Sequence, residues 1–311
     1  MVVKEEILKA ELSAVKKAEM NELYPEYFAD MRDNWFNKEM GKEHRAQYAR
    51  GSGGELESQG KGNKPPKMAS LRSSSAMTYN ILGNDEVKIR TNCFGLSEGN
   101  YRIEYEKQIY PLKYGMPANL DAFLVSGNHA VFCEMKMMEW ICNTPGVLRS
   151  AYKDSSNYFP SSKNKRYAET FIKIIYLLEE EMAQSCNGRK ESPLHFKRYD
   201  AWQMLKHTLA IYHYLLDKKF THITLLNVVF EPSEDIFSPE GKCQYLKMLQ
   251  EEHREFQRFL NIIERSGLYH MFKEDCGVDF SIKYISAADF IECLEKTSEE
   301  REYLNRYQLK R

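Results

Sequence analysis

The stretch Leu120–Met138, LDAFLVSGNHAVFCEMKMM, consists of two apolar runs on either side of Ser126-Gly-Asn-His129. Gly-Asn is a good two-residue hairpin turn, because Gly adopts positive φ without steric cost. With this pair as the turn, Ser126 faces His129. Each step outward then pairs one residue from each strand. The predicted register places Asp121 directly opposite Glu134.

Three ionisable side chains are expected to converge at the open end of this hairpin. Asp121 and Glu134 would be cross-strand neighbours with side chains roughly 5 Å apart. Lys136 lies two residues beyond Glu134 and therefore points to the same face. Two opposed carboxylates are unfavourable without a cation between them. The pattern favours a bound Mg²⁺ or Mn²⁺, with the carbonyl of Met135 as a further ligand.

A metal-assisted reaction at phosphate follows from this set of residues. A divalent ion polarises a phosphate oxygen and lowers the pKa of a bound water. Lys136 can orient that water or stabilise negative charge in the transition state. The alternative is a solvent-exposed ladder of charges on a hairpin edge, which would show the same pattern of Asp121, Glu134 and Lys136.

The rest of the chain predicts a mixed α/β (α+β) architecture. We expect a helical N-terminal extension over residues 1–50 and one domain over 51–311. Within that domain, a helix over 70–82 precedes a strand-rich region over 86–138. Helices over 166–186 and 199–217, a strand over 222–230, a helix over 240–268 and a strand-helix unit over 278–296 follow. This order is typical of a sheet covered by helices in three layers.

Asp121 followed by Glu134-Met135-Lys136 resembles the PD-(D/E)XK signature of restriction-endonuclease-like nucleases. The helix with Ser73-Ser-Ser-Ala-Met77 and Asn80 is similar to a segment of a prokaryotic branch of restriction-endonuclease-like proteins. The resemblance covers about residues 51–230. It implies a restriction-endonuclease-like αβββαβ core with a central mixed sheet, in which the acids lie on the second and third core strands.

The resemblance implies a Mg²⁺-dependent endonuclease or exonuclease acting on DNA in restriction, defence or repair, with RNA as an open alternative. A homodimer is also left open, since many nucleases of this fold cut two strands as dimers. One departure is the missing acid on the first core helix, where Asn80 takes the inward position. Glu55 could fold over the site and supply it. Without such an acid, the site would either hold only one metal ion or be degenerate, in which case the chain would bind nucleic acid or protein without cutting.

The helix over 199–217 offers further candidates for the site. Gln203 lies one turn from both Lys206 and His207, and related nucleases often place a Gln or a basic residue there. Basic side chains near the site are expected to contact nucleic-acid phosphates. They are Lys64, Lys67, Arg72 and Lys206.

Each of these groups has a structural alternative. Gln203 fits an ordinary amphipathic helix equally well. The basic residues near Lys64 fit a solvated loop. Glu104 and Glu106 fit the surface of a strand, although Glu104 could approach the site from there.

Composition limits the class of protein. The 311 residues are 42% hydrophobic with a formal net charge of −1, so a packed core is expected and a chain-wide polycation is excluded. The 7 cysteines lack a CxxC pair, which indicates reduced thiols. The charged N-terminus and the lack of a long apolar run predict no signal peptide and no membrane span, hence a cytoplasmic protein.

Overall fold

The computed structural model describes residues 2–15, 18–50, 54–58, 64–90, 93–142, 148–161, 163–184 and 196–309. The strands are β1 (Glu86–Ile89), β2 (Gly99–Ile109), β3 (Ala118–Ser126), β4 (His129–Lys136), β5 (His222–Val229) and β6 (Asp279–Ser286). The helices are α1 (Val2–Ala14), α2 (Lys42–Arg50), α3 (Ser74–Leu82), α4 (Glu139–Cys142), α5 (Tyr167–Gln184), α6 (Ala201–Leu215), α7 (Pro239–Ser266), α8 (Leu268–Cys276), α9 (Ala287–Cys293) and α10 (Ser298–Leu304).

The strands form one mixed sheet in the order β1-β2-β3-β4-β5-β6. β1 to β4 are antiparallel neighbours, whereas β4, β5 and β6 run parallel. Parallel strands need crossover connections, and helices α4 to α6 and then α7 and α8 supply them. The predicted mixed α/β architecture is confirmed.

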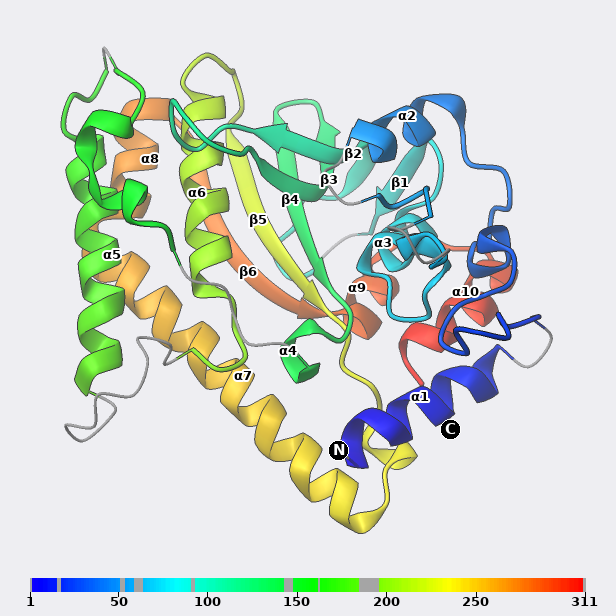
Figure 1. The fold of residues 1–311 in the computed structure, drawn as a ribbon. Coiled ribbons are helices and arrows are strands. Elements are labelled where there is room, and N and C mark those ends of the chain that lie inside the picture. The colour runs from blue at the N-terminus through cyan, green and yellow to red at the C-terminus, as the bar shows by residue number, and fades with distance from the viewer. Residues whose placement is uncertain are drawn as a thin grey trace.

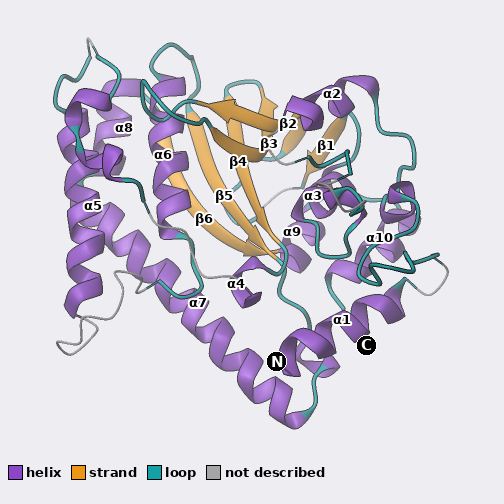
Figure 2. Cartoon of the chain, viewed as in Figure 1, coloured by secondary structure: helices purple, strands orange, loops and turns teal. Residues whose placement is uncertain are grey.

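Helices cover both faces of the sheet, as Figures 1 and 2 show. On one face, α5, α6, α7 and α8 bury a core that includes Phe132, Leu209 and Phe259. On the other face, α1, α2, α3 and α9 share a second core that includes Tyr79 and Phe290. Because β4 and β5 are covered on both faces, their sequences are almost continuously apolar.

The predicted hairpin register is confirmed. Ser126 pairs with His129, and the pairing continues outward to Ala122 and Cys133. Gly127 has φ 58°, a conformation in the turn that Gly adopts without the steric cost of a Cβ. Asp121 and Glu134 are therefore the next residues outward on the two strands.

Capping residues explain where the helices differ from the predicted ranges. The helix expected over 70–82 begins at Ser74, because the side chain of Ser73 accepts a hydrogen bond from the Ala76 amide. The helix expected over 240–268 ends at Ser266, because Gly267 adopts φ 81° and ends α7 before α8 begins.

The two ends of the chain pack against the same core. Val3 of α1 and Leu304 of α10 belong to the core that also contains Tyr79, and Figure 1 places both termini near α1. Asn80 joins these segments, since its Nδ2 donates to the Asn34 carbonyl at 2.8 Å and to the Tyr307 hydroxyl at 2.7 Å. Among the described residues, no helix is both long and apolar enough to cross a membrane.

Candidate functional site

Asp121, Glu134 and Lys136 meet at the end of the β3–β4 hairpin. Oδ2 of Asp121 accepts a hydrogen bond from the backbone N–H of Met135 at 2.6 Å, which fixes this carboxylate to β4. On β4, Nζ of Lys136 lies 2.7 Å from Oε1 of Glu134. The Glu134 side chain is 4% exposed and that of Lys136 is 18% exposed. The structure thus brings the predicted triplet together, with Lys136 nearer to solvent.

Helix α6 contributes Gln203 to the same group. Nε2 of Gln203 donates to Oε1 of Glu134 at 2.7 Å, and Oε1 of Gln203 accepts from Nζ of Lys136 at 2.6 Å. The backbone N–H of Gln203 donates to the Asp200 carboxylate, which caps the helix. The start of α6 therefore places one amide side chain between the acid and the lysine.

His207 lies one turn further along α6 and is completely buried. Its Nε2 is 2.9 Å from Oε2 of Glu134. Both atoms are buried, and neither has another polar partner among the described residues. Burial lowers the pKa of His207, against the opposing effect of the Glu134 charge. Burial therefore favours the neutral form of His207, whereas the contact with Glu134 favours its charged form.

Glu134 and Lys136 stabilise each other's charged forms. Burial acts to raise the pKa of Glu134, but the charges of Lys136 and His207 and their contacts lower it to about 2. Burial acts to lower the pKa of Lys136, but the charges of Glu134 and Glu139 raise it above its ordinary value. For both groups, the contact with the opposite charge therefore shifts the pKa in the direction opposite to burial and favours the charged form.

The surroundings of Asp121 and Glu106 disfavour the charged forms of these two carboxyl groups. Burial raises the pKa of Asp121 well above its ordinary value, and the charges of Glu134 and Glu106 add to this. The pKa of Glu106 is likewise raised to about 8. Burial is the largest cause, and the charges of Glu55 and Glu134 add to it. Glu106 therefore joins the site, although its place in the sequence suggested the surface of a strand. Glu104 instead pairs with Lys107 at 2.8 Å.

The local backbone of β2 explains why Glu106 lies there. Tyr105 pairs with Ala122 and packs in one core, whereas Ile109 packs in the other, so β2 changes face between them. Glu106 lies at the change with φ 50°, between the pairs Tyr105–Ala122 and Lys107–Leu120 that flank Asp121 on β3. The only sequence signal is the break in apolar alternation after Tyr105, which does not specify this conformation.

Glu55 lies beside Glu106 rather than at the hairpin itself. Its carboxylate pairs with Nζ of Lys67 at 3.3 Å, and its carbonyl accepts a hydrogen bond from the Met68 amide. Its charge is the largest electrostatic contribution to the raised pKa of Glu106 after burial. The structure thus brings Glu55 to the edge of the acidic group through Glu106.

The remaining predicted basic residues contact the protein itself. Nη1 of Arg72 lies 2.9 Å from Oε2 of Glu26, and Nζ of Lys64 lies 5.5 Å from the centre of the Tyr27 ring. Burial lowers the pKa of Lys206. Lys206 lies on α6, the helix that also carries Gln203.

The donor atoms of the hairpin suit a hard divalent cation. Oε2 of Glu134 is buried without a hydrogen-bond partner, and Asp121 adds a second carboxylate. Across the described ranges, no group of three or more His, Cys, Asp or Glu side chains is arranged to hold a metal ion. The residues that fit Mg²⁺ or Mn²⁺ by their chemistry are therefore Asp121 and Glu134, with the Met135 carbonyl as the third expected ligand.

No protein-family model matches this chain, and comparisons with curated proteins and with solved structures give no significant match.

Proposed function

We propose that the protein is a metal-dependent nuclease that hydrolyses phosphodiester bonds of DNA in restriction, defence or repair. The observation that supports this most is the contact of Lys136 with both Glu134 and Gln203 beside a second carboxylate, Asp121. These residue types are the ones that metal-assisted phosphate hydrolysis needs. The proposal includes a restriction-endonuclease-like core, and a homodimer for cutting two strands.

Asp121 and Glu134 would hold Mg²⁺ or Mn²⁺, together with the Met135 carbonyl. When bound, this ion supplies Lewis-acid polarisation of a phosphate oxygen and a more acidic water. Glu134 and the Gln203 amide hold Lys136 in place through Nζ contacts of 2.7 and 2.6 Å. An ammonium group has three N–H donors, so one is left to donate to a phosphate oxygen or to the attacking water.

The direct test is cleavage of plasmid DNA with Mg²⁺ or Mn²⁺. Asp121→Asn and Glu134→Gln are expected to reduce cleavage by at least about 100-fold, in line with the loss of a transition-state contact. Glu104→Gln is the matched control, because Glu104 pairs with Lys107 outside the site. Cleavage at the wild-type rate by both site variants would overturn the assignment.

A second candidate is a nuclease-fold module that binds nucleic acid or protein without cutting. The closed network around Glu134 favours it, because Oε1 already accepts hydrogen bonds from Lys136 and Gln203. Calorimetry with Mn²⁺ distinguishes the two candidates. A nuclease should bind the ion in a way that Asp121→Asn abolishes, whereas the module should show no heat that depends on Asp121.

A further inference from the structure

A large cavity lies between α1 and the C-terminal segment. It is open to solvent and has a volume of about 1320 Å³, more than the ~300–1,000 Å³ typical of small-molecule pockets. Its apolar wall includes Phe28, Phe36 and Phe237, and Ala14 of α1 lies at its edge. Its lining shares no residue with the acidic site on β3, β4 and α6. The cavity is therefore a separate candidate for ligand binding.

Arg306 is the buried charge in the cavity wall. The residue is 8% exposed, and its Nη1 donates to the Tyr303 hydroxyl at 3.1 Å. Its guanidinium lies 5.5 Å from the ring centres of Phe28 and Tyr303 and 5.2 Å from that of Tyr307. Within the described part of the chain, no carboxylate lies within ion-pairing distance of it. Aromatic rings alone compensate poorly for a buried cation.

Glu11 of α1 is the acid whose charge acts on Arg306. Both of its carboxylate oxygens are buried without a hydrogen-bond partner. Burial raises the pKa of Glu11 to about 8, even though the charges of Arg72 and Arg306 lower it. Glu11 is therefore mostly protonated near pH 7 and does not neutralise Arg306.

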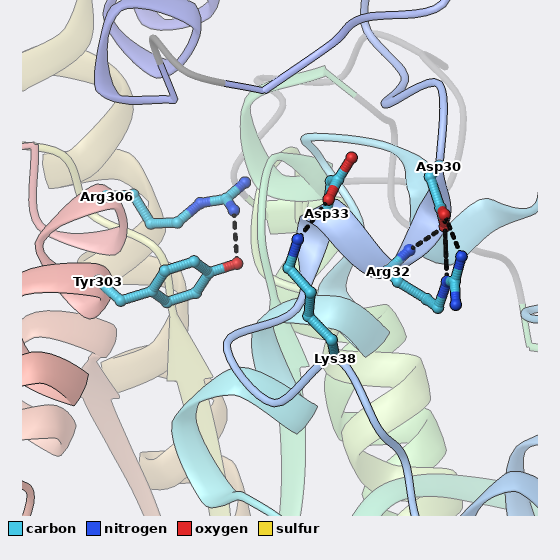
Figure 3. Close-up of polar contacts among 6 residues, drawn as sticks. All are labelled: Asp30, Arg32, Asp33, Lys38, Tyr303 and Arg306. Atoms are coloured by element: carbon cyan, nitrogen blue, oxygen red, sulfur yellow. Dashed lines mark hydrogen bonds and ion pairs between the residues drawn. The ribbon is translucent and has the colours of Figure 1, made fainter.

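The other acids of the wall are less buried than Arg306. Oε1 of Glu6 accepts a hydrogen bond from the Ser238 amide at 3.2 Å, whereas its Oε2 has no hydrogen-bond partner. Asp33 pairs with Lys38 at 2.7 Å, and Figure 3 shows this pair apart from the Arg306–Tyr303 pair. The remaining acids, Glu299 and Glu302, are exposed on α10. The most buried charged residue of the lining is thus Arg306.

We propose that this cavity binds a small organic anion through Arg306. The planar guanidinium presents a fork of N–H donors that matches a phosphate or carboxylate group. One of these donors contacts Tyr303, and the others make no hydrogen bond to a described residue. The rings of Phe28, Phe36 and Phe237 then cover the flat or apolar part of the ligand.

Thermal unfolding with four probes tests this proposal on the full chain. They are a nucleoside 5′-monophosphate, the same nucleoside without phosphate, inorganic phosphate and benzoate, each against sodium chloride at equal ionic strength. A ligand that binds the native state raises the melting temperature. We expect a rise of several degrees with an organic anion and little with the uncharged nucleoside. The phosphate and benzoate arms distinguish a phosphate ligand from a carboxylate ligand.

Two variants assign the effect to the cavity. Arg306→Gln removes the charge, and Ala14→Trp fills the space from an exposed position of α1 without changing the core. Both should abolish the rise. Arg254→Gln on the exposed face of α7 is the matched control and should keep it. Asp121→Asn should also keep it, since the acidic site is separate.

The outcomes divide cleanly. If none of the anions shifts the wild-type melting temperature at millimolar concentration, the proposal is wrong. It is also wrong if Ala14→Trp and Arg306→Gln both respond as the wild type does. If Arg306→Gln does not fold, Ala14→Trp still decides, because it keeps every residue around the guanidinium.

Discussion

Lys136 is a partly buried cation and Arg306 is a buried one, and their charges are compensated differently. Lys136 lies 2.7 Å from Glu134 and shares Gln203 with it, so each charge has a direct partner. Arg306 contacts a tyrosine hydroxyl and three aromatic rings. The charge of Glu11 acts on Arg306, but the two side chains form no ion pair or hydrogen bond. One buried charge is balanced within the protein, whereas the other lines a cavity.

A buried charge is compensated in two ways in this protein. A buried ion pair is stable when hydrogen bonds satisfy its remaining atoms, and removing one partner leaves an uncompensated charge. At the hairpin, Gln203 supplies those hydrogen bonds to both partners. Beside α1, Arg306 lines a space large enough for a ligand. The first arrangement suits chemistry on a fixed site, and the second suits binding.

The largest effect is expected from Lys136→Met. It leaves the Glu134 charge buried without its cation, at a cost of about 3–5 kcal/mol of unfolding free energy. Arg306→Met breaks no ion pair and should cost clearly less, about 1–2 kcal/mol from lost packing and one hydrogen bond. Urea unfolding at neutral pH measures both values. Equal losses would show that the two cations are compensated alike.

Glu11→Gln should change how stability depends on pH. The folded pKa of about 8 lies above the unfolded value of 4.5, so the native state binds this proton more tightly. The resulting stability is present below about pH 4.5 and is lost as the pH rises through about 8. Glu11→Gln should therefore be more stable than the wild type at about pH 9, by a few kcal/mol. Parallel pH profiles of the two proteins would contradict this.

Gln203→Leu should weaken the acidic site without unfolding the protein. It removes two hydrogen bonds but leaves the ion pair between Glu134 and Lys136, so we expect a loss of about 1–3 kcal/mol. DNA cleavage should fall by more than this loss of stability explains, since Lys136 is no longer held on one side. Tyr214→Phe, at the other end of the same helix, is the control for changes on α6. Unchanged cleavage by Gln203→Leu would remove Gln203 from the site.

The smallest effect concerns the backbone of β2. Glu106 has φ 50°, where Gly is free of strain, so Glu106→Gly should raise the unfolding free energy by up to about 1 kcal/mol. Glu104→Gly, two residues away in regular strand, should lower it by about the same amount. Chemical denaturation of the two variants compares the signs. A loss of stability in both would mean that φ at Glu106 carries no strain.

The β3–β4 hairpin and its triplet could be predicted because their causes are local. A Gly-Asn turn fixes the register, and the period of two then places Asp121 opposite Glu134 with Lys136 on the same face. The N-cap Asp200 likewise fixes where α6 starts, and with it the position of Gln203. Short-range geometry is sufficient in both cases.

Glu106 and Arg306 were not predicted, because their surroundings come from distant parts of the chain. The burial of Glu106 depends on a change of face in β2 that its own residue type does not favour. Arg306 contacts Phe28, which is nearly the whole chain length away in sequence. The sequence by itself determined the hairpin and its charged triplet through local backbone rules. The packing of α1 against the C-terminal segment decided which other charges are buried and which of them lack a partner.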